Sequence, residues 1–459
     1  MPETTGMAQA EQTEEIEQTE TRAYNGPRYV AGRYRVRVEA LLPDGLAQGR
    51  IVEVTESPDA AEFAAVFGEG RPVEMPEEFT FVGGLPGEMV EVEARWNLPR
   101  PGRKRAKRVP PPQVRVVEII AAAPGRAMPG CPVFGECGGC QLQHMTYAAQ
   151  LAWKRDRVTA LLRDAGFNDP PVEPALGCAS PWGYRNHMRF SVNWEGQPGL
   201  TARGSHRVLP LRACPLAHPR INEALAVLAE HPLPRPQVVV RYGVATNQML
   251  IQPQPTDEAQ ARVRAADIDL RVETLEEEMG GARFRIRPSS FFQTNTLQAN
   301  QMAALVLNRL PAGPDVTLVD AYCGVGVFAR LLAERAGTVV AIEESASAIR
   351  DARWNLRETP NVEIVQAKVE DVLPGMTRRL DGLVIDPPRA GCQRPVLDAL
   401  IARRVPRVVY VSCNPETLAR DVAILCLQSS AYRLVSVQPL DMFPQTAHIE
   451  NIALLEAHA

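Results

Sequence analysis

Apolar and polar residues alternate along much of the region from Tyr34 to Ile120. Alternation with a period of two is the pattern of half-buried strands, and turn-forming residues separate the runs. Short strands spaced in this way predict a small closed β barrel of the OB type, although a plain β domain fits the alternation equally well. The expected strands are residues 35–41, 49–54, 79–82, 88–93 and 113–120, and an acidic insertion at 55–77 is expected to be a loop.

The pattern changes after residue 290, where short apolar runs alternate with helical segments to the end of the chain. A repeating β-α order predicts a parallel sheet with helices on both faces, which is a doubly wound, Rossmann-like α/β domain closed by a late strand. A helix is expected at 297–310. The expected strands are residues 316–321, 338–343, 362–366, 381–385, 405–412, 432–439 and 449–455, with helices between the first six.

The stretch between these regions has a mixed pattern and is expected to form an α+β domain. Helices are expected at 146–166 and 222–230. Strands are expected within 184–194, 238–244, 249–252 and 284–288. The predicted organisation is an acidic tail over 1–30, a barrel over 31–120, a central domain over 121–289 and a catalytic domain over 290–459.

The net charge of −4 hides an uneven distribution. Residues 1–22 hold six Glu and one Arg, and this segment, poor in apolar side chains, is expected to be disordered. The rest of the chain carries 49 basic and 48 acidic residues, and positions 95–115 carry eight Arg or Lys and no acid. Such a run is often a solvated loop. Beside an OB-type barrel it favours RNA binding, because Arg and Lys are the side chains that contact phosphates.

Composition describes an ordinary multidomain protein. A chain of 459 residues is too long for one core, and its 45% apolar and 23% charged content is typical of folded domains. No apolar run is long enough to cross a membrane, and no export signal is recognisable, so we expect a cytoplasmic monomer. The nine cysteines, an odd number, favour metal binding or catalysis over disulfides.

Three cysteines, Cys131, Cys137 and Cys140, lie within ten residues, among glycines that let the backbone wrap closely. This spacing favours a metal or cluster site over simple packing. Three thiolates leave a tetrahedral site incomplete, and Cys214 in a turn-rich stretch is the expected fourth ligand, with Cys178 and His144 as alternatives. Four thiolates suit either zinc or a 4Fe–4S cluster, and spacing does not separate the two.

A glycine-containing turn follows the first expected strand of the last domain. Gly324 and Gly326 let the backbone approach a ligand closely. Asp320 ends that strand and Glu343 ends the next, where a carboxylate can accept both hydroxyls of a ribose. The loop lacks the full dinucleotide pattern, which favours S-adenosylmethionine, although a plain βα turn is the simpler alternative.

The run Val-Val-Tyr-Val is followed by Ser-Cys413-Asn-Pro and by a helical pattern that opens at Glu416. Cys413 is therefore expected at the carboxyl end of a strand and beside a helix N-terminus, a position that lowers a thiol pKa and produces a nucleophile. A buried, unreactive cysteine is the alternative. Asp386, in an Asp-Pro-Pro turn, is expected to project into the same crevice, and Glu450 borders the terminal strand.

Motifs in this order resemble the RNA uracil-5-methyltransferase family. They are Phe291–Asn295, Asp320–Phe328, Asp386–Arg389, Ser412–Pro415 and His448–Glu450. The cysteine motif at 131–144 and the sequence Leu85-Pro-Gly-Glu88 extend the resemblance to nearly the whole chain after residue 30. They are similar to the iron–sulfur branch of the family, which carries a TRAM domain and modifies 23S ribosomal RNA.

The resemblance implies methylation of C5 of a uridine in 23S rRNA, with S-adenosylmethionine and a 4Fe–4S cluster as cofactors and RNA as the partner. Cys413 would add to C6 of the uracil, and Glu450 would remove the C5 proton. The residues implied to hold cofactor or substrate are Gln293, Tyr322, Gly324, Gly326, Glu343 and Asp386. Those implied to hold the cluster are Cys131, Cys137, Cys140 and Cys214.

Two positions depart from the family pattern. Val327 stands where several members have Asn, and Asp371 is only one candidate for an adenine contact. Rival interpretations are a tRNA uracil-5-methyltransferase, a cytosine-5 methyltransferase that uses the same thiol, and a non-catalytic RNA-binding or assembly factor. A radical enzyme is disfavoured because four thiolates would leave no iron open.

Overall fold

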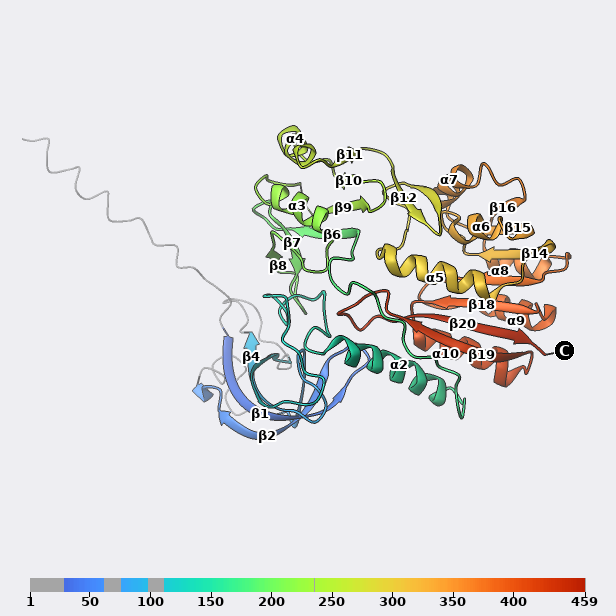
Figure 1. Cartoon of the computed structure of the whole chain (residues 1–459). Coiled ribbons are helices and arrows are strands. Elements are labelled where there is room, and N and C mark those ends of the chain that lie inside the picture. The colour runs from blue at the N-terminus through green and yellow to red at the C-terminus, as the bar shows by residue number, and fades with distance from the viewer. Residues whose placement is uncertain (1–28, 62–75, 98–110, 235, 459) are drawn as a thin grey trace, which may run out of the picture.

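The computed structural model describes residues 29–61, 76–97, 111–234 and 236–458 (Figure 1). An N-terminal sheet is followed by a central α+β part and a C-terminal α/β domain. The expected acidic tail, most of the basic run and most of the acidic insertion lie outside the described residues. Within the described ranges, no helix is long and apolar enough to cross a membrane.

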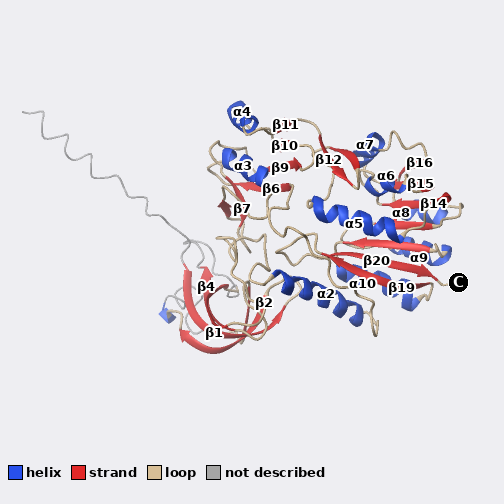
Figure 2. Ribbon diagram, in the orientation of Figure 1, coloured by secondary structure: helices blue, strands red, loops and turns tan. Residues whose placement is uncertain are grey.

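The N-terminal sheet is antiparallel and strongly curved, with the strand order β3-β2-β1-β4-β5 (Figure 2). Its strands are β1 (Tyr29–Leu41), β2 (Ala47–Glu56), β3 (Glu78–Phe81), β4 (Met89–Asn97) and β5 (Gln113–Ala121). Alternate side chains of β1, including Tyr34, Val36 and Val38, point inward and are buried. A bridge between Val82 and Arg115 brings the end of β3 to β5. Each of the five expected strands is therefore present.

The central part is built on a second sheet, with the order β11-β10-β9-β6-β7-β8. Its strands are β6 (His187–Val192), β7 (Pro198–Thr201), β8 (Val208–Pro210), β9 (Gln237–Gly243), β10 (Gln248–Gln252) and β11 (Asp269–Arg271). The helices are α2 (Tyr147–Asp164), α3 (Pro219–Leu228) and α4 (Asp257–Ala265), and a hairpin joins β12 (Leu275–Met279) to β13 (Ala282–Ile286). The sequence pattern missed β12 because a buried acid, Glu277, stands among its inward positions.

The C-terminal sheet has seven strands in the order β16-β15-β14-β17-β18-β20-β19. They are β14 (Gly313–Ala321), β15 (Ala336–Glu343), β16 (Val362–Gln366), β17 (Gly382–Ile385), β18 (Arg407–Ser412), β19 (Tyr432–Leu440) and β20 (Glu450–Ala457). The helices are α5 (Thr296–Arg309), α6 (Val327–Leu332), α7 (Ala346–Asn355), α8 (Val369–Val372), α9 (Arg394–Arg403) and α10 (Pro415–Ala423), with short helical turns at Leu373–Gly375 and Ile424–Gln428. The first five strands pair in parallel, and β20 is antiparallel to both neighbours. This is the predicted doubly wound sheet closed by a late strand.

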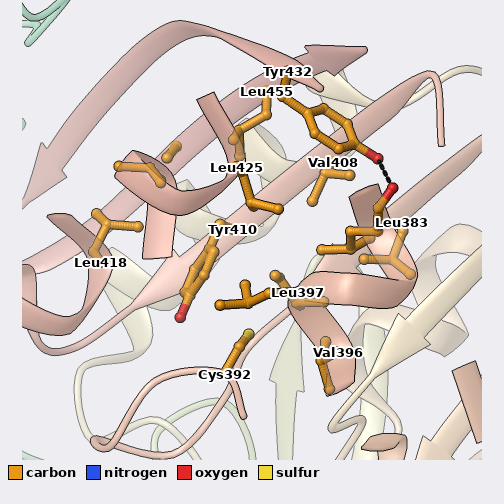
Figure 3. Packing of buried hydrophobic residues seen from close by; sticks show 14 of the residues in the cluster. Leu383, Cys392, Val396, Leu397, Val408, Tyr410, Leu418, Leu425, Tyr432 and Leu455 are labelled. Carbon is orange, nitrogen blue, oxygen red and sulfur yellow. Dashed lines mark hydrogen bonds between the residues drawn. The ribbon is translucent and has the colours of Figure 1, made fainter. Parts of the chain in front are cut away.

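The largest core lies against the β17-β18 part of this sheet, where α9 and α10 cover it (Figure 3). Leu383, Val408 and Tyr410 are fully buried there, as are Leu397 and Leu425 from the covering elements. A core of this extent makes the sheet a rigid support, because closely packed side chains resist local displacement.

The loop between β19 and β20 is held by the central part of the chain. The carbonyl of Gln445 accepts backbone hydrogen bonds from Gln141 (3.1 Å) and Leu142 (3.0 Å). Gln150 on α2 donates to the Gln445 side chain (2.9 Å) and accepts from its backbone N–H (3.0 Å). The segment that follows Cys140 is therefore joined to the loop that leads into β20.

A buried ion pair completes this junction. Nζ of Lys154 lies 2.5 Å from Oδ1 of Asp441 and 3.2 Å from the carbonyl oxygen of Phe443. Both charged side chains are fully buried. A buried charge is strongly destabilising once its partner is removed, so this pair keeps α2 and the loop in one arrangement.

We expect Lys154→Ala to lower the free energy of unfolding by about 3–5 kcal/mol, because it leaves the Asp441 carboxylate buried and unpaired. Denaturant unfolding measures the loss. Arg35→Ala is the control, since the side chains of Arg35 and its partner Glu53 are 48% and 50% exposed and such a pair contributes about 0–1 kcal/mol. Equal losses in the two variants would contradict this account of the junction.

Candidate active site

Three neighbouring strands of the C-terminal sheet present expected site residues at one edge. Asp386 directly follows β17 and Cys413 directly follows β18, and these strands are parallel. Strand β20 is antiparallel to β18, with Asn451 opposite Ser412, so its first residue, Glu450, lies at the same edge. The topology thus brings together a thiol and two carboxyl groups from distant parts of the sequence.

The backbone around Cys413 is held by the start of α10. Asn414 caps this helix by accepting from the backbone N–H of Glu416 (3.1 Å), and its side-chain nitrogen donates to the carbonyl of Arg389 (3.0 Å). Pro415 follows as the first helical residue, where its fixed φ suits the helix and no amide hydrogen is needed. Cys413 is therefore fixed between the strand end and the helix cap, with its side chain partly exposed.

The thiol of Cys413 does not have the lowered pKa expected from the helix terminus. Burial raises its pKa, and the charges of Glu450 and Asp386 raise it further, whereas a hydrogen bond from Arg389 and its charge lower it. The expected lowering is absent because burial of the thiol, and then the two nearby acids, outweigh the contacts that lower the pKa. Thiolate formation at this site therefore depends on those acids and on Arg389.

Both carboxyl groups at the edge hold their protons more tightly than usual. Burial raises the pKa of Asp386 to about 7. Burial and the neighbouring Asp386 raise the pKa of Glu450 well above its ordinary value, and Arg389 opposes this shift. Groups with raised pKa values in a cleft suit proton transfer near neutral pH.

The glycine turn at the end of β14 forms an open cradle. Tyr322, Gly324 and Gly326 all have positive φ values, of 66°, 55° and 88°. A Cβ placed on Gly324 would meet nothing within 4 Å, so that side of the loop is free for a ligand, whereas one on Gly326 would lie 3.0 Å from Leu356. The backbone N–H of Gly324 donates to Glu343 (3.0 Å), which places the carboxylate beside the loop.

Asp320 fixes the helix that follows this loop. Its Oδ2 accepts from the backbone N–H of Ala329 (2.7 Å), which anchors the first turn of α6. Burial, followed by the charges of Asp386 and Glu343, raises the pKa of Asp320 to about 7. The cradle and the Cys413 edge therefore share one electrostatic environment.

Two other expected positions lie apart from this group. The backbone carbonyl of Gln293 accepts from Asn186 (3.3 Å), and Gln293 lines a small cavity with Asn186 and His187. Asp371 lies exposed in the first turn of α8. Among the described residues, no hydrogen bond or ion pair joins either of them to Cys413.

The four expected cysteine ligands surround one cavity. Cys131, Cys137, Cys140 and Cys214 all line a space of about 290 Å³. Burial raises the pKa of the first three thiols, and the charge of Cys214 raises each further, as expected for sulfurs in proximity. In the described part of the chain, no three such side chains converge closely enough to hold a single metal ion. Other residues, among them Arg185, His187 and Arg189, also line this cavity.

The alternative fourth ligands lie elsewhere. The sulfur of Cys178 donates to the carbonyl of Ser180 (3.1 Å). The ring of His144 is buried, with Nε2 3.1 Å from the carbonyl oxygen of Gly84. Neither side chain lines the cysteine cavity, whereas Cys214 does.

Comparison with known proteins decides the family. A family profile described as tRNA (Uracil-5-)-methyltransferase matches residues 258–458. An uncharacterized RNA methyltransferase of Thermosynechococcus vestitus is 35% identical over 390 residues, which cover 74% of this chain and 87% of the relative. Another, from Halalkalibacterium halodurans, is 32% identical over 397 residues, covering 74% and 86%.

The chain belongs to the RNA uracil-5-methyltransferase family. The crystal structure of Pyrococcus abyssi tRNA (uracil-54, C5)-methyltransferase in complex with S-adenosyl-L-homocysteine superimposes with a TM-score of 0.66 and 24% identity, over 92% of this chain and 99% of that one. At this identity the likeness establishes a shared fold. The methyltransferase fold expected for the C-terminal domain is thereby confirmed.

The sequence motifs suggested no role for two residues of this methyltransferase, Arg389 and His448. Arg389 acts on the pKa values of Cys413 and Glu450, and its Nη2 donates to Nδ1 of His448 (3.2 Å). Burial, with Arg389 next, lowers the pKa of His448 to about 4, so its neutral ring can accept this bond. The signal for Arg389 was its place in the Asp-Pro-Pro-Arg turn.

We expect Asp386→Asn to stabilise the methyltransferase more at pH 8 than at pH 4. The carboxyl group has an ordinary pKa of 3.8 and a folded-state pKa of about 7. Its raised pKa favours the folded state fully below 3.8, and this contribution is lost as pH rises to about 7, at about 1.4 kcal/mol per pKa unit. Thermal or denaturant unfolding across this range measures the difference, and a pH-independent difference would contradict burial of Asp386.

Proposed function

We propose that this methyltransferase transfers a methyl group from S-adenosylmethionine to C5 of a uridine in 23S rRNA, through a covalent bond between Cys413 and C6. The observation that carries the proposal is the meeting of Cys413, Glu450 and Asp386 at one sheet edge, beside Arg389. A thiol, a buried proton acceptor and a cation are the groups that this chemistry requires.

The covalent step answers a chemical problem. C5 of uracil is a poor nucleophile, and addition of the Cys413 sulfur to C6 makes C5 enolate-like, so that it can accept a methyl group. Thiolate formation is supported by the hydrogen bond and charge of Arg389, the contacts that lower the Cys413 pKa. The negative charge that develops on the ring is best stabilised by the same cation and by Asp386 while it holds its proton, whereas Glu450 acts as a carboxylate.

Release of the product requires removal of the C5 proton. Glu450, at the start of β20, is the acceptor in this proposal. The electrons of the C5–H bond then re-form the C5–C6 double bond, and the sulfur–C6 bond breaks. The raised pKa of Glu450 suits a base that must be strong enough to take a carbon-bound proton.

S-adenosylmethionine, when bound, supplies the electrophilic methyl group. The residues proposed to hold it are the cradle formed by Tyr322, Gly324 and Gly326, together with Glu343 for the ribose. The open side of Gly324 and the carboxylate beside it support this fit. Gln293 and Asp386 are proposed to hold cofactor or substrate.

We propose that Cys131, Cys137, Cys140 and Cys214 hold a 4Fe–4S cluster. All four thiols line one cavity, which supports a shared site, and the choice of a cluster over zinc rests on the resemblance to the iron–sulfur branch. The methyl transfer itself needs no electron, so the cluster's role here is to shape the central domain. The contacts of Gln141 and Leu142 with Gln445 extend that shaping to the loop before Glu450.

The choice of 23S rRNA rests on the N-terminal sheet and the cysteine motif, which resemble the TRAM-containing, iron–sulfur branch. The Leu85-Pro-Gly-Glu88 turn supports the assignment, because Glu88 is fully buried and accepts from Leu85 (2.8 Å) and Arg126 (2.8 Å). Transfer RNA is the competing substrate, favoured by the printed names of the family profile and of the structural neighbour.

Nucleoside mass spectrometry of separated rRNA and tRNA, from cells with and without the gene, tests the proposal. We expect 5-methyluridine to fall only in large-subunit rRNA of the deletion strain. A loss confined to tRNA would keep the reaction and overturn the substrate. Unchanged 5-methyluridine in both fractions would contradict uridine methylation and favour a non-catalytic RNA-binding role.

Purification without oxygen should give about four irons and four sulfides per chain if the cluster assignment is correct. Cys137→Ala should lose most of this iron, because it removes one of the four ligands. Cys178→Ala is the matched control, since its sulfur lies outside the cavity and should leave the iron content unchanged. One zinc and no iron in the wild-type protein would contradict a cluster.

A further inference from the structure

Arg241 is a buried cation that forms no direct ion pair with any described residue, although the charge of Asp351 acts on it from a distance. It lies on β9, is 8% exposed, and its Nε is buried without a hydrogen-bond partner. Its guanidinium forms no ion pair and no hydrogen bond with any of the residues that the structure describes. Burial of an unpaired charge costs several kcal/mol, so a fold that keeps one has a reason to do so.

Other basic groups share this face of the central sheet. His187 on β6 lies directly opposite Arg241, and Arg189 lies two residues further along the strand, so all three side chains emerge on one face. Nε2 of His187 is also buried without a partner, and Arg189 is exposed. This face therefore extends from the buried Arg241 to the exposed Arg189, and the buried ring and guanidinium nitrogens on it have free hydrogen-bonding capacity.

This face turns toward the catalytic domain. Leu250 lies on β10 and is the strand partner of Arg241. It packs in one cluster with Phe284 and Phe292. Arg241 and His187 line a small cavity together with Gln293. Gln293 stands three residues before α5 begins, so this cavity lies next to the N-terminal end of that helix.

Nearby carboxylates are already engaged. Asp351 accepts from the Arg287 side chain (2.7 Å), from its backbone N–H (3.0 Å) and from Ser290 (2.7 Å). Glu277 lines the same cavity but accepts from the backbone N–H groups of Val244 (2.8 Å) and Ala245 (3.1 Å). Neither acid pairs directly with Arg241, although the charge of Asp351 partly opposes the lowering of the Arg241 pKa.

The local potential is strongly positive. Burial, with Arg189 next, lowers the pKa of Arg241 to about 10. Burial, followed by the charges of Arg241 and Arg189, lowers the pKa of His187 to about 3. The ring is therefore neutral and can donate a single N–H, while two guanidinium groups supply charge. These are the donors that bind a phosphate.

We propose that Arg241, His187 and Arg189 form a binding site for a backbone phosphate of the RNA, which guides the strand toward Gln293 and the Cys413 edge. The inference rests on the proposed function, because it names where that RNA is held. A phosphate is favoured over the carboxylate of the cofactor because this basic face reaches the surface at Arg189, whereas the cofactor cradle lies at the end of β14.

Arg241→Met tests the site, because it removes the charge but keeps an unbranched chain. In the wild-type protein, bound phosphate would offset the cost of burying the Arg241 charge only when RNA is present. Without RNA, the Arg241→Met variant should therefore melt at a higher temperature than wild type. The affinity of the Arg241→Met variant for a fluorescent oligouridylate of about 20 nucleotides should be about 3- to 10-fold lower than that of wild type. The slope of log K against log salt should shrink by about 0.7, the value for one phosphate contact on a single strand. Inorganic phosphate should raise the melting temperature of wild type but not of the variant.

Two further variants keep the test decisive. Arg189→Met, at an exposed position, should show the same loss of slope without a folding defect. Arg283→Met is the control, since its guanidinium is already paired with Glu278 (2.9 Å). The proposal is overturned if Arg241→Met and Arg283→Met bind oligouridylate with equal slopes, or if Arg241→Met weakens S-adenosylhomocysteine binding instead. These binding and melting measurements do not depend on methyl transfer, so they stand apart from the test of the reaction.

Discussion

The buried pair between Lys154 and Asp441 is the constraint on which the arrangement of the site depends. Asp441 begins the loop that leads to Glu450, and Lys154 belongs to the helix that follows the cysteine segment. Since neither charge tolerates burial alone, the two parts of the chain form together. The reciprocal bonds of Gln150 and Gln445 then fix the register between them. The same contacts therefore hold the cysteine segment and the loop before the proposed base in one arrangement.

Burial of acids is the second organising feature. Asp320, Asp386 and Glu450 all have raised pKa values because each is buried near another carboxyl group or in an apolar setting. Arg389 is the cation that opposes these shifts at Cys413 and Glu450.

Local pattern predicted the catalytic domain well, since each strand from β14 to β20 is a short apolar run bounded by turns and the β-α order restricts the topology. The edge positions of Asp386, Cys413 and Glu450 follow from that topology. The raised pKa of Cys413 could not be predicted, because it depends first on burial in the folded chain and then on acids at the end of β17 and in β20. The absence of an ion pair at Arg241 could not be predicted either, because it depends on the contacts that nearby carboxylates such as Asp351 make with other elements. Short or polar strands such as β8, β11 and β12 give no periodic signal and were missed.

In the proposed reaction, Cys413 bonds to C6 of the uracil and Glu450 later removes the C5 proton. Glu450→Gln enzyme incubated with S-adenosylmethionine and an unmethylated 23S rRNA transcript, followed by denaturing gels and peptide mass spectrometry, examines it directly. We expect a stable RNA adduct on Cys413 that carries the added methyl group, and no adduct when Cys413→Ala is used. Methylated, freely released RNA from the Cys413→Ala variant would contradict the proposed reaction.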